Sequence, residues 1–147
     1  MPISEPFTSD SQVAAIAGGL IDRTLPRSSW THAAHFSATL WLLSTRPYAQ
    51  VATELPGLIR AYNVATGLAN TDAKGYHETI TQASLRAAAA FRADRPERPL
   101  FETCNALMRS PLGQPDWLLT HWSRERLFST EARREYVAPD LAPLPFA

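Results

Sequence analysis

Apolar residues recur at helical spacing along this 147-residue chain, and prolines and glycines separate the periodic segments. A period near 3.6 residues is typical of amphipathic helices, whereas strands require alternation with a period of 2. No segment shows that alternation with any weight, so we predict an all-α fold. The pattern indicates a single-domain bundle of six or seven helices, at about residues 10–23, 30–44, 48–66, 76–93, 100–108, 116–126 and 130–136.

The length and the composition fit one packed domain. A chain of this size buries enough surface to fold without disulfides or metal, and 45% of its residues are hydrophobic. We expect a tail at residues 1–8, a helical domain at residues 9–137 and a proline-rich arm at residues 138–147. Three apolar residues are expected to anchor the arm on the domain, namely Leu141, Leu144 and Phe146.

Two helix boundaries depend on single residues. Ser29 is a good N-cap for the second helix, because its hydroxyl can accept a free N–H of the first turn. Pro56, followed by Gly57, falls inside the third expected helix. Either that helix kinks there, or it splits and restarts with Pro56 in a first turn, where the missing N–H does no harm.

Charge and cysteine content exclude some classes of protein. The 14 basic and 14 acidic residues balance, which argues against a nucleic-acid partner. No apolar run approaches the roughly 20 residues that a membrane span requires, so we expect no membrane partner. Cys104 is the only cysteine and lies among apolar residues, which indicates a buried thiol in a reducing compartment. With no signal-peptide pattern at the N-terminus, we expect a cytoplasmic protein. The chain can be a monomer or a homodimer.

The histidines are the strongest candidates for chemistry. His32 and His35 are three positions apart, so on a helix they share one face. Two imidazoles in that register can bind one metal ion, with His77 as a third ligand and His121 or Glu78 as a further one. Imidazole ligands suit Zn, Fe, Ni or Cu. We therefore predict a divalent-metal site in which Glu78 acts as ligand or base.

Two alternatives to the metal site remain open. Each histidine can be an ordinary hydrogen-bonded residue of the core or surface. A metal-free acid–base site is the other alternative, in which His77 works with Tyr76 and Glu78 beside a polar loop. The letters HETIT resemble the start of the HExxH helix of zinc proteases, but Thr81 stands where the second histidine is required.

Several aromatic and amide side chains allow a ligand pocket as well as plain packing. The tryptophans and two of the tyrosines can line a pocket for a small ligand or fill the core. Asn63 and Asn70 flank the polar loop and can orient a ligand or simply form a turn. The aromatic residues in question are Trp30, Trp41, Trp117, Trp122, Tyr62 and Tyr76.

A WTHxAH motif lies at Trp30–His35 and a GYHET motif at Gly75–Thr79, accompanied by Tyr62–Asn63, Asn70–Thr71 and Val137–Leu141. Through these stretches the chain resembles, over nearly its whole length, a group of small bacterial helical proteins with the same motifs. That group brings no established activity. In size and class the chain is also similar to the DinB/YfiT-like helical bundles, which bind a divalent metal through three histidines. In those bundles the second helix has one histidine and a later helix has an HxxxH pair, whereas here the pair lies on the second helix.

From these patterns we expect a metal-binding helical protein that acts on a small molecule. His32, His35, His77 and His121 are the expected metal ligands, and Glu78 and Tyr76 the expected catalytic residues. The alternative is a non-catalytic helical module that binds a small ligand or a partner protein, with structural histidines.

Overall fold

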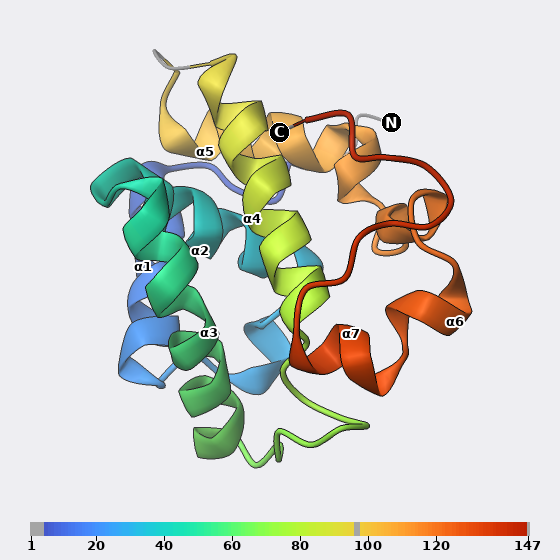
Figure 1. The fold of residues 1–147 in the computed structure, drawn as a ribbon. Helices are drawn as coiled ribbons and strands as arrows, with labels where there is room; N and C mark the ends of the chain where they lie inside the picture. The colour runs from blue at the N-terminus through green and yellow to red at the C-terminus, as the bar shows by residue number, and fades with distance from the viewer. Residues whose placement is uncertain (1–4, 96–97, 147) are drawn as a thin grey trace.

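A computed structural model describes residues 5–95 and 98–146 of the chain. Within those ranges it contains seven α-helices, three short 3-10 helices and no strand, which confirms the predicted all-α fold (Figure 1). The α-helices are α1 (Asp10–Asp22), α2 (His32–Thr45), α3 (Tyr48–Ala65), α4 (Glu78–Ala93), α5 (Leu100–Arg109), α6 (Arg124–Leu127) and α7 (Thr130–Arg134). The 3-10 helices are η1 (Arg27–Ser29), η2 (Pro111–Gly113) and η3 (Trp117–Thr120). None of the helices described is both long and apolar enough to cross a membrane.

Helix α2 lies at the centre of the bundle and packs against α1, α3, α4 and α5. Its apolar residues are distributed around the helix rather than along one stripe, and such a helix is stable only when neighbours cover it on several sides. Its buried polar residues bond to the helix itself. Ser37 Oγ donates to the Ala34 carbonyl at 2.9 Å, and Thr39 Oγ1 donates to the His35 carbonyl at 2.8 Å.

The start of α2 differs from the prediction. Ser29 belongs to η1, and the N-cap is Thr31, whose Oγ1 accepts the Ala34 N–H at 3.1 Å. Both residues have a hydroxyl suited to capping, and the sequence does not decide between two caps so close together. The helix therefore begins at His32, and Trp30 lies outside it. His32 and His35 keep the predicted helical spacing.

Helix α3 runs without interruption through Pro56, so of the two alternatives left open by the sequence the split does not occur. A proline inside a helix leaves the carbonyl four residues earlier without its usual donor. Here that carbonyl belongs to Ala52, and Gln82 of α4 places Nε2 3.4 Å from it. A neighbouring helix thus supplies the donor that the proline lacks.

The predicted helix at residues 116–126 is broken into η3 and α6. The break lies at Ser123, whose N–H and hydroxyl each donate to the Asp140 carboxylate at 2.7 Å. Ser123 Oγ also caps α6 by accepting the Arg126 N–H at 3.2 Å. The contact with Asp140, 17 positions further along the chain, therefore interrupts the helix at Ser123. Helical periodicity in the sequence could not reveal this interruption.

The C-terminal arm runs from α7 back over the bundle and ends beside α4 (Figure 1). The Leu141 N–H donates to the His121 carbonyl at 2.9 Å, and the Trp122 indole N–H donates to the Val137 carbonyl at 3.0 Å. Two expected anchors, Leu144 and Phe146, pack against the core. The third expected anchor, Leu141, is 61% exposed and does not serve that purpose.

Candidate functional site

Three of the four histidines line one cleft, which we call the histidine cleft. Its volume is about 280 Å³, and η1, α2, α3 and the start of α4 form its walls. The cleft brings together most of the predicted site residues, but neither His121 nor Glu78 lines it. Its lining residues are Arg27, Trp30, Thr31, His32, His35, Ile59, Asn63, Gly75, Tyr76, His77, Ile80 and Thr81.

His35 has the most unusual environment in the cleft. Its Nε2 atom is buried, and within the described residues it has no hydrogen-bond partner. The ring lies against Trp30, with 5.5 Å between ring centroids. Burial lowers the pKa of His35 to about 4, and the charge of His32 adds to that effect. His35 is therefore neutral at pH 7, and its unpaired nitrogen costs about 1–3 kcal/mol unless another molecule meets it.

His32 is held by the main chain of η2. Its Nε2 atom lies 2.8 Å from the carbonyl oxygen of Leu112. A carbonyl only accepts hydrogen bonds, so this nitrogen carries the hydrogen. In the neutral ring the lone pair is then on Nδ1, which leaves that atom free to accept a hydrogen bond or bind a metal.

His77 uses both of its ring nitrogens within the fold. It is the N-cap of α4, and its Nδ1 accepts the Ile80 N–H at 3.1 Å. Its Nε2 lies 2.7 Å from the Leu127 carbonyl, to which it donates. Burial lowers the pKa of His77 below its ordinary value, which favours this neutral ring. A metal could bind His77 only by replacing one of these two bonds.

Tyr76 and Glu78, the predicted catalytic residues, form a pair. The Tyr76 hydroxyl donates to the Glu78 carboxylate, which Gln82 Nε2 also approaches at 3.4 Å. The Arg60 guanidinium lies 4.3 Å from the centre of the Tyr76 ring. Burial raises the pKa of Tyr76, and the bond to Glu78 acts in the same direction. The phenol therefore keeps its proton at neutral pH.

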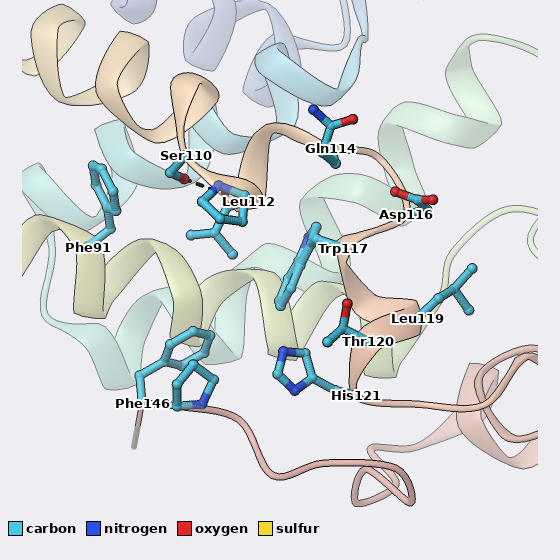
Figure 2. A pocket seen from close by; sticks show the side chains of 12 residues that line it. Phe91, Ser110, Leu112, Gln114, Asp116, Trp117, Leu119, Thr120, His121 and Phe146 are labelled. Atoms are coloured by element: carbon cyan, nitrogen blue, oxygen red, sulfur yellow. Dashed lines mark hydrogen bonds between the residues drawn. The ribbon is translucent and has the colours of Figure 1, made fainter.

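No group of three or more His, Cys, Asp or Glu side chains in the described ranges is placed to hold a metal ion. His32 and His35 are the two predicted ligands that stay adjacent on one helix and share the cleft. His121 lies elsewhere and lines a larger cavity that shares no residue with the histidine cleft (Figure 2). Its Nδ1 lies 3.2 Å from each of the carbonyl oxygens of Ala142 and Pro143.

Arg27 is a site residue that we did not predict. Its Nη1 donates to Asn63 Oδ1 at 2.7 Å and lies 3.4 Å from Thr66 Oγ1. Buried Asn63 in turn donates to Asn70 Oδ1 at 3.0 Å, and Asn70 Oδ1 also accepts the Tyr76 N–H at 3.0 Å. The polar loop is thus tied to the arginine through two amides. Arg27 follows a proline in a chain break, and nothing in the sequence indicates where it points.

The cleft has an excess of positive charge. None of its lining residues is acidic, and Arg27 is held by neutral amide and hydroxyl groups. No ion pair among the described residues involves Arg27. Its charge is therefore not neutralised by a neighbouring carboxylate, which favours negatively charged molecules near the cleft.

No protein-family model, curated protein or solved structure matches this chain.

Proposed function

We propose that this protein binds a small oxyanion, such as a carboxylate or sulfonate, in the histidine cleft. The observation that carries the proposal is the buried Nε2 atom of His35, which has no partner among the described residues. A ligand oxygen at that atom would give His35 the hydrogen bond that the fold does not supply. The cleft volume of about 280 Å³ suits a small molecule.

The charge of the cleft supports an anion rather than a cation. Among the described residues the Arg27 guanidinium has no carboxylate partner, and the network through Asn63 holds it in place. Guanidinium groups bind oxyanions through paired N–H donors, and such charged hydrogen bonds are stronger than neutral ones. In the proposed complex Arg27 and the N–H of His35 both donate to the ligand.

This arrangement gives the affinity a defined dependence on pH. An anion beside His35 favours the imidazolium, so the pKa of His35 rises above about 4 in the complex. Binding then takes up a proton, and the affinity increases as the pH falls from neutrality toward 4. A base with a pKa near 4 is weak at pH 7, so ligand binding is better supported than proton abstraction.

The predicted divalent metal is the alternative occupant of the same cleft. It is favoured by the common face of His32 and His35, which also line the cleft together. Metal ligation requires neutral imidazoles, so metal affinity would decrease as the pH falls. The two occupants therefore predict opposite effects of pH.

The test uses methanesulfonate, which stays anionic at every relevant pH, and dimethyl sulfone as its uncharged counterpart. We expect methanesulfonate to shift the NMR signals of His35 and Arg27, and to bind about 5–10 times more weakly to Arg27→Gln. Arg124→Gln is the matched control, because Arg124 is exposed on α6 and lines none of the described cavities.

Equal responses to both probes, or equal loss in both arginine variants, would rule out the anion site. Uptake of one Zn²⁺, Fe²⁺, Ni²⁺ or Cu²⁺ per chain that His35→Gln abolishes would instead support the metal.

A further inference from the structure

We propose that the larger cavity, which we call the apolar cavity, binds one small aromatic molecule that carries a hydroxyl group, as in a phenol. Its volume is about 630 Å³, within the range of roughly 300–1,000 Å³ typical of small-molecule sites. It is lined by Phe91, Ser110, Pro111, Leu112, Gln114, Asp116, Trp117, Leu119, Thr120, His121, Pro145 and Phe146. This proposal does not depend on the histidine cleft.

The shape and chemistry of the walls favour an aromatic ring. Figure 2 shows Phe91, Leu112, Trp117 and Phe146 around a common space. The Trp117 ring centroid lies 6.5 Å from that of Phe146, with 51° between the rings. Aromatic side chains at such angles present ring faces and edges against which the ring of a ligand can pack. A charged ligand would lose its hydration in an apolar cavity without gaining a partner, so an uncharged ring is favoured.

His121 supplies the polar group that defines the ligand. Its Nδ1 faces two carbonyl oxygens of the arm, those of Ala142 and Pro143, at 3.2 Å each. Since carbonyls only accept, Nδ1 carries the hydrogen, and the neutral ring has its lone pair on Nε2. In Figure 2 this second nitrogen lies on the side of Trp117 and Phe146.

Among the described residues no donor forms a hydrogen bond with His121 Nε2. The arm thus fixes which His121 nitrogen is an acceptor, and a ligand with a donor group matches it. An ether of the same size has no hydrogen to donate and leaves that acceptor without a partner, which lowers its affinity.

The position of the arm indicates a small molecule rather than a partner chain. Phe146 and Pro145 form one wall of the cavity, and the arm is fixed on the domain by the bond from Leu141 N–H to the His121 carbonyl. A helix or strand of another protein would have to displace this segment. A single ring fits without moving it.

The experiment compares 4-ethylphenol with 4-ethylanisole, its methyl ether, by NMR titration of the whole protein. We expect both to shift the signals of residues 110–121 and 141–146, including the indole N–H of Trp117. The phenol should bind about five times more tightly, as expected for one hydrogen bond to a neutral acceptor. In His121→Phe, which keeps a ring of similar shape, the two probes should bind equally.

A pair of arm variants gives a matched control. Phe146 lines the cavity, whereas Leu141 is 61% exposed on the same arm. Phe146→Ala should weaken both probes and Leu141→Ala should weaken neither. The proposal is overturned if the wild-type protein binds phenol and ether equally, if the shifts lie elsewhere, or if neither probe binds. The wild-type comparison decides the matter even if His121→Phe is poorly folded.

Discussion

The Nε2 atom of His32 lies 2.8 Å from the carbonyl oxygen of Leu112. His32 lines the histidine cleft, and the side chain of Leu112 lines the apolar cavity (Figure 2). The η2 turn therefore contacts both sites, one through its main chain and the other through a side chain. A displacement of this turn changes both at once.

Gly113→Ala tests the role of the turn. A Cβ at this position would lie 1.9 Å from the Met108 carbonyl oxygen, so the backbone of η2 must move. We expect the free energy of unfolding to fall by about 1–3 kcal/mol and the NMR signals of both His32 and Leu112 to shift. Urea denaturation and NMR spectra measure the two effects.

Gly57→Ala is the control for that substitution. Apart from its chain neighbours and the backbone of its own helix, a Cβ there meets no atom within 4 Å, and Gly57 lies inside helix α3. We expect it to stabilise the protein by about 0.5–1 kcal/mol, because alanine is the better helix former. Equal effects of the two substitutions would contradict the tight packing of η2.

His77→Ala should destabilise the protein. It removes the cap of α4 and the bond to the Leu127 carbonyl, and we expect a loss of about 2–4 kcal/mol in urea denaturation. His77→Asn keeps a side-chain acceptor for the Ile80 N–H and should recover about 1 kcal/mol. If His77→Ala keeps full stability but loses a bound metal, His77 is a ligand rather than a structural residue.

His35 should make stability fall in mild acid. Its pKa is about 4 in the folded protein against 6.5 in the unfolded chain, so below pH 6.5 the unfolded chain takes up the proton first. The contribution of neutral His35 to the free energy of unfolding is fully present above pH 6.5 and is lost as the pH falls to 4. It amounts to on the order of 3 kcal/mol.

A comparison of unfolding free energies isolates this effect. Wild-type protein and His35→Gln should differ by an amount that changes between pH 7 and pH 4. The lowered pKa of His77 also makes the free energy of unfolding fall in acid, but it does so in both proteins, so its effect cancels when the two free energies are subtracted. A difference that stays constant over this window would contradict a neutral His35 whose pKa is lowered to about 4.

Cys104 should be unreactive in the folded protein. It is buried, and burial raises the pKa of its thiol to about 12, with the charge of Asp10 acting in the same direction. We expect a thiol reagent at pH 8 to react at least about 100-fold more slowly with native than with denatured protein. Comparable rates would show that the thiol is accessible.

Helical periodicity was enough to predict most of the fold. The elements α1, α3 and α5 follow it closely, because neighbouring residues set their starts. Ser9 caps α1, and α3 and α5 each begin directly after a proline, Pro47 and Pro99. Prediction was wrong where distant residues decide the backbone, as at Ser123, which Asp140 turns. Neither the donor from Gln82 that keeps α3 whole nor the choice of Thr31 over Ser29 as cap could be read from spacing.

The site was predictable only in part. Spacing placed His32 and His35 on one face, because the period of a helix fixes that relationship. Spacing could not show that His77 would cap a helix or that His121 would face the apolar cavity. The positions of both side chains depend on backbone carbonyls more than 20 residues away, those of Leu127 and Pro143. Arg27 is held beside the cleft by its hydrogen bond to Asn63, which lies 36 positions further along the chain.

The most direct test of the proposed function is the titration of the His35 ring by ¹⁵N NMR, with and without methanesulfonate. We predict that the His35 ring titrates near pH 4. Methanesulfonate should raise that pKa, and dimethyl sulfone should leave it unchanged. If the His35 ring titrates near the ordinary value of 6.5, or if its pKa does not change with methanesulfonate, the proposal that His35 binds an anion in the cleft is contradicted.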